Sequence, residues 1–287
     1  MALLAFVVTA LLGVEAAKEL TARQVIERIQ EHTGGRDGDA WKGPTVDTFK
    51  AGDPETPVTG IATTFSATME VLQRAAARKA NLIIAHEPTF YNHMDETAWL
   101  GDDPVLQAKL AYVKEHHLVV WRFHDHWHRS PGQPDGVLKG MVAALGWSAF
   151  QSASEPYRFR VPETTLTDLA GQIKKRLGIR TLRVVGDPRL KVSEVAYLPG
   201  AAGREHQVKA LQSAQVQVLV AGESAEWEAV LHVVDAVGQG RPKGLILMGH
   251  VASEELGMKE CVDWLRPFVP EVPIEFIPAG EPFWVPE

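Results

Sequence analysis

Asn81-Leu82-Ile83-Ile84-Ala85-His86-Glu87 is an apolar run that stops abruptly at a histidine and a carboxylate. Gly244-Leu245-Ile246-Leu247-Met248-Gly249-His250 repeats this pattern more than half the chain later, with Glu254 following. Short apolar runs of this kind are typical of strands buried in parallel sheets. Because both runs end in residue types that bind metals, they predict strands whose carboxyl ends meet at one metal site.

A third histidine-rich segment lies between these two runs. Leu118-Val119-Val120-Trp121 leads into His124-Asp125-His126-Trp127-His128. An extended backbone would send His124, His126 and His128 to one side, because side chains alternate along a strand. A loop would scatter them instead. The segment therefore offers further imidazole ligands, but the spacing alone does not determine how many of the three histidines bind a metal.

The first two segments must each meet a geometric condition to bind a metal. His250 and Glu254 are four residues apart, so a helix that begins just after the strand would present both on one face. The same spacing is also common in surface pairs. His86 and Glu87 are neighbours and would point apart on a strand, so both reach one site only if the strand ends there. Pro88 favours such an ending.

The rest of the chain alternates predicted helices with short predicted strands. A first helix is capped by Thr21 and ended by Gly34-Gly35, and residues 36–57 are predicted to be loop. This alternation favours an α/β fold of two similar halves, about 21–150 and 155–287, with mixed or mainly parallel sheets packed around a central metal site. The other helices are predicted over 67–79, 104–117, 136–145, 166–177, 205–214, 225–237 and 253–265, and the strands over 58–65, 82–85, 119–123, 183–185, 192–198, 216–221, 244–248 and 274–277.

The composition excludes some classes of function. The chain carries 29 Lys and Arg against 36 Asp and Glu, a formal net charge of -7. This charge argues against a broad nucleic-acid surface, because phosphate binding needs clustered cations. A hydrophobic content of 45% over 287 residues is enough for a sizeable core. The single cysteine, Cys261, excludes an internal disulfide, and its helical pattern predicts a core position.

The first residues have the pattern of a targeting segment. Residues 2–12 are almost purely apolar, Gly13 breaks the run, and Val14-Glu15-Ala16 supplies the small-x-small pattern of a signal peptidase site. The run is too short to span a bilayer as a mature helix. Residues 1–17 are therefore predicted to be a signal peptide, which would leave an exported (periplasmic or extracellular) α/β domain over 18–287. Because no Lys or Arg precedes the apolar run, a core-packed helix in a cytoplasmic protein is the alternative.

Four segments, taken in chain order, carry a resemblance to a known family: Asn81 to Pro88, His124 to His128, Val184 to Pro188, and Gly249 to Glu254. Their order resembles that of the dinuclear-metal-centre proteins related to NGG-interacting factor three, some of which are described as type 2 GTP cyclohydrolase I. The likeness runs from about Thr21 to Leu265. The Gly-His-x-x-Ser-Glu segment is its most specific part.

The resemblance implies a site for two divalent metal ions, with ligands at His86, Glu87, His128, His250 and Glu254. Glu87 stands where the family usually has a second histidine, and His128 where it usually has an aspartate. The set still holds three imidazoles and two carboxylates, which suit Zn, Fe or Mn, so we expect a rearranged site with Glu87 as the bridge. Possible additional ligands, or groups that orient the ligands, are His93, His124, Asp125 and His126.

These features favour a metal-dependent hydrolase in which a metal-bound hydroxide attacks a small-molecule substrate, such as a nucleotide, a cyclic amide or a phosphoester. The alternative is a metal-binding, metal-trafficking or scaffold protein without turnover. The sequence has no Gly-x-Ser-x-Gly elbow, no phosphate-binding loop of the Gly-Lys-Ser/Thr type and no dinucleotide-binding glycine motif. The resemblance also implies a homohexamer. Neither a nucleic-acid partner nor a stable membrane span is expected.

Overall fold

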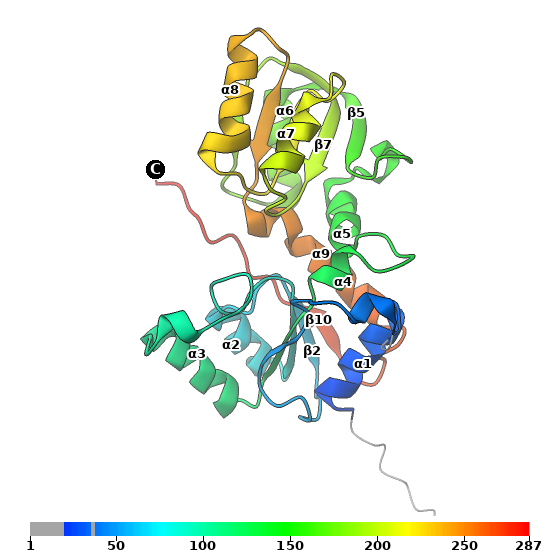
Figure 1. Ribbon diagram of the computed structural model, residues 1–287, viewed down its shortest axis with the longest axis vertical. Helices are drawn as coiled ribbons and strands as arrows, with labels where there is room; N and C mark the ends of the chain where they lie inside the picture. The colour runs from blue at the N-terminus through cyan, green and yellow to red at the C-terminus, as the bar shows by residue number, and fades with distance from the viewer. Residues whose placement is uncertain (1–19, 36–37, 287) are drawn as a thin grey trace, which may run out of the picture.

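The chain folds into two lobes joined by a pair of packed helices (Figure 1). The computed structural model describes residues 20–35 and 38–286, so the predicted signal peptide lies outside the described residues. Each lobe is built on a mixed five-stranded sheet with helices packed against it. The predicted α/β fold with mixed sheets is therefore confirmed.

The elements of the first lobe are the strands β1 (Phe49–Ala51), β2 (Ile61–Thr64), β3 (Leu82–Ala85), β4 (Val119–Arg122) and β10 (Ile274–Phe276), the helices α1 (Ala22–His32), α2 (Met69–Ala77) and α3 (Pro104–Glu115), and the 3-10 turns η1 (Asp39–Trp41) and η2 (Ala98–Leu100). The strand order is β1-β4-β3-β2-β10. All neighbours pair in parallel except β1, which runs antiparallel to β4. β2, β3 and β4 are buried along their whole length, as expected for strands covered on both faces.

The second lobe contains the strands β5 (Arg158–Thr165), β6 (Arg183–Val185), β7 (Lys191–Leu198), β8 (Val218–Ala221) and β9 (Gly244–Leu247), the helices α6 (Leu166–Leu177), α7 (Arg204–Gln212) and α8 (Leu231–Gly238), the 3-10 turn η3 (Ser148–Phe150) and the π turn η4 (Glu226–Val230). Its strand order is β5-β7-β8-β9-β6. β7, β8 and β9 are parallel, and both edge strands are antiparallel to their neighbours. The first sheet therefore has four parallel strands, and the second has three.

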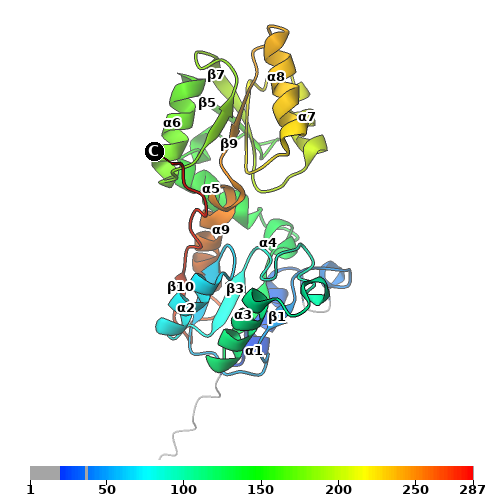
Figure 2. The ribbon, with the colours of Figure 1, turned by 90° about the vertical axis from the view of Figure 1, so that its left-hand side faces the viewer.

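Two long helices connect the lobes: α5 (Gly136–Leu145) leads from the first lobe to the second, and α9 (His250–Leu265) returns (Figures 1 and 2). The two helices approach each other very closely. A Cβ atom on Gly140 would lie 2.6 Å from the Leu256 carbonyl oxygen, and one on Gly257 would lie 2.5 Å from the Val137 Cα. Glycine at both positions is therefore a packing requirement, and it fixes how the lobes face each other.

Two strands were not predicted from the sequence. β1 lies in the segment that was predicted to be loop. This edge strand has only three residues, and the polar and glycine-rich residues around it are typical of loops. β5 alternates buried Phe159 and Val161 with exposed Arg160, which is the period of a strand that has one solvent-facing side. Such edge strands lack the continuous apolar run by which the buried strands were recognised.

Three other expectations need correction. The last strand belongs to the first sheet, because β10 pairs with β2. The helix predicted over 225–237 is broken, since Glu228 adopts φ -104 and ψ -116 within η4, ahead of α8. The His124 to His128 segment is not extended: residues Asp125–His128 form the short helix α4. A four-residue helix carries too little periodicity to be distinguished from a strand end.

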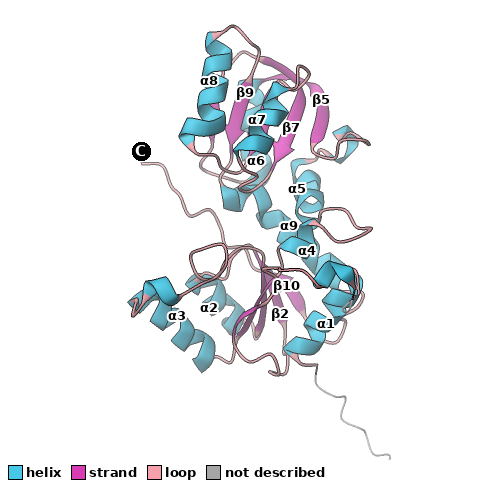
Figure 3. Cartoon of the chain, viewed as in Figure 1, coloured by secondary structure: helices cyan, strands magenta, loops and turns pink. Residues whose placement is uncertain are grey.

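The C-terminal segment runs from β10 back to the second lobe without regular secondary structure (Figure 3). The Glu281 carboxylate accepts hydrogen bonds from the backbone amides of Arg180 and Thr181, at 2.7 and 2.6 Å. The Gly280 amide donates to the Glu255 side chain at 2.8 Å. These contacts add a second tie between the lobes. Within the described residues, no helix is both long and apolar enough to cross a membrane.

Candidate metal centre

The structure gathers six of the predicted residues at the carboxyl ends of the parallel strands, where the two lobes meet: His86, Glu87, His124, His128, His250 and Glu254. β3 ends at Ala85, so His86 and Glu87 both leave the strand and both reach the cluster. β9 is followed by Gly249 at φ 89, a conformation that suits glycine and turns the chain sharply into α9. That turn presents His250 and, one helical turn later, Glu254.

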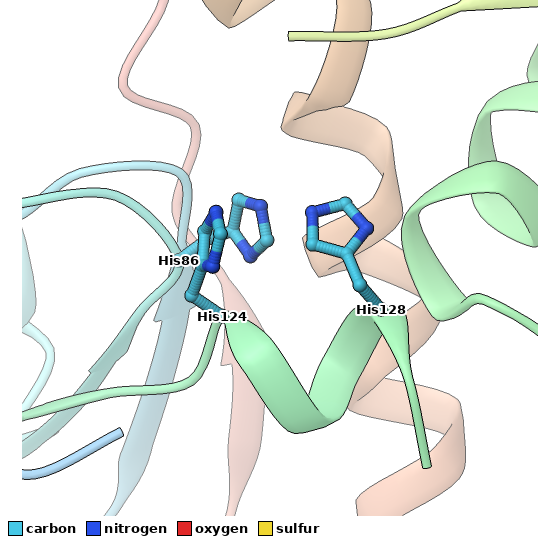
Figure 4. A group of neighbouring side chains, drawn as sticks. All are labelled: His86, His124 and His128. Atoms are coloured by element: carbon cyan, nitrogen blue, oxygen red, sulfur yellow. The ribbon is translucent and has the colours of Figure 1, made fainter. Parts of the chain in front are cut away.

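Three imidazole rings face one another at one end of the cluster (Figure 4). The ring centroids of His86 and His124 are 4.7 Å apart, those of His86 and His128 are 4.9 Å apart, and those of His124 and His128 are 5.0 Å apart. One ring nitrogen from each lies within 4.8 Å of the other two. α4 places His124 and His128 four residues apart, and therefore on one helical face.

The backbone and Asp135 orient two of these rings. His86 Nδ1 donates to the Phe123 carbonyl oxygen at 3.0 Å, and His128 Nδ1 lies 3.0 Å from the Asp135 carboxylate. Tyr157 donates to the same Asp135 oxygen at 2.9 Å. A histidine whose Nδ1 hydrogen is engaged in this way presents its Nε2 lone pair to the cluster, which is the usual arrangement for a metal-binding imidazole.

Two carboxylates complete the cluster. Glu254 Oε2 lies 3.5 Å from His86 Nε2 and 3.1 Å from His250 Nε2. Glu87 Oε1 lies 3.4 Å from both His124 Nε2 and His250 Nε2. His86, Glu87 and Glu254 form a second group of closely spaced ligand atoms, which shares His86 with the group of three histidines. The candidate ligand atoms therefore form two adjoining groups. Glu87 belongs to the second group and also lies beside His124 of the first.

The donor atoms fit a divalent cation. His86 Nε2 is buried and has no hydrogen-bond partner, although an unpaired buried polar atom costs free energy. Its neighbours are imidazole nitrogens and carboxylate oxygens, the ligand types that Zn, Fe and Mn share. A lone pair left unpaired among such groups is the arrangement expected of a cation site rather than of a hydrogen-bonded core.

The cluster strongly perturbs the pKa values of its members. Burial disfavours the charged form of His250, but the hydrogen bonds that its ring donates to the Glu223, Glu254 and Glu87 carboxylates outweigh burial and raise its pKa to about 12. Burial also opposes ionisation of Glu87, yet the neighbouring His124 and His250 hold the pKa of this carboxyl far below its usual range. The carboxylates thus create a negative potential at the cluster. The proton held by His250 compensates this negative charge, and a bound cation would compensate it in the same way.

The other predicted residues lie around the cluster or outside it. His126 points away from it: Nδ1 is 2.7 Å from Asp47, Nε2 is 3.0 Å from the Ala40 carbonyl oxygen, and the ring stacks on Trp41. The expectation that His126 shares a side with His124 and His128 is wrong, because a helical turn rotates it to the opposite face. Asp125 lies 3.0 Å from His124 Nδ1.

His93 is exposed, and its ring centroid lies 5.8 Å from that of His124. It is therefore beside the cluster and separate from both closely spaced groups of ligand atoms.

Arg122 is a residue of the candidate site that the sequence did not predict. It is fully buried; its Nε donates to the His86 carbonyl oxygen at 3.0 Å, and one guanidinium nitrogen lies 3.2 Å from Glu87 Oε2. Its other terminal nitrogen lies 3.5 Å from Asp95. The guanidinium therefore holds the outer oxygen of Glu87 and leaves Oε1 facing the imidazoles. Its signal in the sequence is a single charged residue within a buried apolar run.

Glu223 was also missed. It follows β8 directly after Gly222, and its Oε1 lies 3.4 Å from His250 Nδ1. Like β3 and β9, β8 is a short, fully buried apolar strand, and a carboxylate follows soon after its end. Extending the rule of an apolar run ending in a carboxylate to this fourth strand would have found it.

Comparison with known proteins identifies the family. The family model described as Duf34/NIF3 (NGG1p interacting factor 3) matches residues 21–282. The chain belongs to the DUF34/NIF3 family. The family resemblance inferred from the four sequence segments is thereby confirmed, and nearly all of the described chain lies within the matched region.

Relatives of this DUF34/NIF3 protein are distant in sequence and similar in fold. A "GTP cyclohydrolase 1 type 2 homolog" of Chlamydia pneumoniae is 23% identical over 247 residues, which cover 82% of this chain and 90% of the relative. The solved structure of a Bacillus cereus protein related to NIF3 is 16% identical, has a TM-score of 0.71 and covers 94% of this chain and 100% of its own. Staphylococcus aureus hypothetical protein SA1388 is 18% identical, has a TM-score of 0.70 and covers 93% of this chain and 99% of its own.

Proposed function

We propose that this DUF34/NIF3 protein binds two divalent metal ions at the cluster and hydrolyses a small-molecule substrate there, of the nucleotide, cyclic amide or phosphoester class. The observation that carries the proposal is the buried, unpaired Nε2 atom of His86 at the junction of two groups of candidate ligands. The name of the Chlamydia relative, a GTP cyclohydrolase 1 type 2 homolog, is consistent with this substrate range.

The ligands in this proposal are His86, Glu87, His128, His250 and Glu254, with His124 added because its ring belongs to the trio of facing imidazoles. Glu87 would serve both ions, since its Oε1 is equidistant from the imidazoles of His124 and His250. When bound, two divalent cations would supply Lewis acidity toward a carbonyl or phosphoryl oxygen and would lower the pKa of water.

The surrounding residues have positioning roles in this proposal. Arg122 fixes one oxygen of Glu87, and Asp135 fixes the ring of His128. The Phe65 ring lies edge-on to His250, with centroids 5.4 Å apart, and packs against that imidazole. Rigid support of this kind lowers the cost of ordering the ligands when cations bind.

Metal stoichiometry tests the ligand assignment. We expect the wild-type protein, dialysed after loading with Zn²⁺ or Mn²⁺, to retain about two ions per chain by elemental analysis, as a two-metal hydrolase requires. Glu87→Gln and His250→Ala should each retain one ion or fewer. His206→Ala is the matched control, because His206 is an exposed histidine outside the cluster. Full stoichiometry in both cluster variants would contradict the assignment.

Turnover separates a hydrolase from a protein that only binds or carries metal. Hydrolysis of GTP, of a cyclic amide such as dihydrouracil and of bis(4-nitrophenyl) phosphate should be measured on the loaded protein, on chelator-treated protein and after metal is added back. We expect chelation to abolish turnover of one class and one particular metal to restore it. Two tightly bound ions with no turnover of any of the three would instead support the binding or trafficking role.

A further inference from the structure

A cavity of about 670 Å³ opens beside the cluster, and Glu87 and His250 both line it. Its other walls come from the loop after β3, the start of α2 and the face of α3 that carries Val105 and Lys109. Much of this lining is apolar, including Phe65 and Met69. The size is within the range of small-molecule pockets, so one end of a bound molecule would reach the cluster while the rest lies along these walls.

Lys109 is an unusual member of this lining. It is 5% exposed, and its Nζ donates to the Thr89 carbonyl oxygen at 2.6 Å. No carboxylate of the described residues lies within ion-pair distance of this ammonium group. The negative charge of Asp95 acts on Lys109 from a distance, but this carboxylate is paired with Lys50 at 3.3 Å and Arg122 at 3.5 Å. A buried lysine without a carboxylate partner is costly, and such residues cluster at functional sites.

Lys109 remains mainly cationic at neutral pH. Burial lowers its pKa to about 8, and the field of Asp95 opposes that shift. The aromatic rings of Phe90 and Tyr91 lie with their centroids 5.6 and 5.4 Å from Nζ, which favours the charged form without supplying a counter-ion. Lys109 therefore lines the cavity as a cation that is paired with no carboxylate of the described residues.

Thr89, a neighbouring residue of the cavity wall, carries a polar atom that lacks a partner. The Thr89 side chain is 1% exposed, and its Oγ1 makes no hydrogen bond. The loop that carries it is firmly held, because the Asp95 carboxylate accepts hydrogen bonds from the amides of Thr89 and Phe90 at 2.6 and 2.9 Å. A fixed hydroxyl donor beside a buried ammonium group is a small recognition site for an anionic oxygen.

We propose that Lys109 and Thr89 bind the carboxylate of a substrate whose apolar body lies against Phe65, Met69 and Val105, with its reacting end at Glu87 and His250. This inference rests on the proposed hydrolase and narrows its substrate class. The single ammonium group of Lys109 and the hydroxyl of Thr89 suit a ligand group with one negative charge. At the end of the cavity away from the cluster, Lys109 is the one Lys or Arg among the lining residues. A carboxylate-bearing cyclic amide therefore fits better than a nucleotide.

Binding of a matched pair of probes tests this inference without turnover. Isothermal titration calorimetry on the metal-loaded protein should compare 1-naphthoate with its neutral analogue 1-naphthamide. We expect naphthoate to bind at least about 10-fold more tightly, because a buried charge-assisted hydrogen bond is worth more than a neutral one. Lys109→Met should remove this preference, and Thr89→Val should reduce it. Lys114→Met, which changes an exposed lysine on the same helix, should leave it intact.

A second variant covers the possibility that Lys109→Met does not fold. Val105 is 61% exposed at the cavity edge in the first turn of α3, so Val105→Glu is compatible with folding. It should weaken the binding of naphthoate more than that of naphthamide, because both probes lose an apolar contact but only naphthoate is repelled by the new carboxylate. Equal affinities for the two probes in the wild-type protein, or tighter binding of GTP than of naphthoate that persists in Lys109→Met, would overturn the inference.

The two proposals fail in different ways. If naphthoate shows no preference while the protein retains two ions and hydrolyses a substrate, the carboxylate assignment is wrong and the hydrolase stands. If the protein retains no metal but naphthoate still binds through Lys109, the hydrolase proposal is wrong and the anion site stands.

Discussion

At the scale of single residues, Arg122 controls the geometry of the site. Its guanidinium group is buried between the Glu87 and Asp95 carboxylates and also holds the backbone carbonyl oxygen of His86. Since Asp95 in turn binds the amides of the loop that lines the cavity, one side chain connects the cluster to the cavity wall. Removing the guanidinium would take from the Glu87 and Asp95 carboxylates the buried partner that they share.

Arg122→Met should therefore be strongly destabilising. We expect the free energy of unfolding to fall by about 3–5 kcal/mol, the cost of breaking a buried ion pair by removing one partner. Urea unfolding followed by circular dichroism measures this change. Arg78→Met is the control, because Arg78 forms an exposed pair with Glu275 at 3.6 Å, and it should cost no more than about 1 kcal/mol. Equal losses in the two variants would contradict a central role for Arg122.

The sequence identified the candidate ligands but not the residues that hold them in place. His86, His250 and Glu254 stand at the ends of recognisable strands, so their meeting follows from parallel-sheet geometry. Arg122 and Glu223 act through contacts between residues remote in the chain, and no local pattern records such contacts. The opposite orientation of His126 depends on one short helical turn.

At the scale of elements, the prediction succeeded where an element carries its own hydrophobic signal. α5 and α6 have the predicted bounds, and both end at glycines in the left-handed conformation, Gly146 and Gly178. The edge strands β1 and β5 and the pairing of β10 were missed, because edge strands are only half buried and strand order is set by tertiary packing. Local propensity determines that an element exists, and packing determines its partner.

The crossing of α5 and α9 is sensitive to one methyl group. Gly257→Ala would place a Cβ 2.5 Å from the Val137 Cα, which forces the helices apart. We expect a loss of about 1–3 kcal/mol in the free energy of unfolding. Gly171→Ala is the matched control within α6, because its Cβ would meet no atom within 4 Å. That change should stabilise the protein by about 0.5–1 kcal/mol, since alanine is the better helix former.

Metal binding in the Gly257 variant provides a second readout. Glu254 lies one turn before Gly257 on α9, so a displaced helix moves this candidate ligand away from His86. The retained metal should fall in Gly257→Ala and stay at the wild-type level in Gly171→Ala. Stability and stoichiometry that are the same in the two variants would show that the helix crossing tolerates a side chain.

At the scale of the whole molecule, the candidate ligands come from both lobes. His86, Glu87 and His124 follow strands of the first sheet, whereas His250 follows β9 of the second. The lobes are otherwise tied by the α5 and α9 pair and by the C-terminal contacts of Glu281. Cations held by this set would therefore join the two lobes, and the free energy of metal binding would add to the stability of the folded chain.

The melting temperature should therefore depend on metal. A ligand at 100 times its dissociation constant stabilises the folded state by about 2.7 kcal/mol, which corresponds to a rise on the order of 5–10 °C for a chain of this size. Differential scanning calorimetry of chelator-treated protein, with and without added Zn²⁺ or Mn²⁺, measures this rise. Glu87→Gln and His250→Ala should lose most of it because each removes a ligand, and His206→Ala should keep it. A rise of the same size in all three variants would place the stabilising metal outside the cluster.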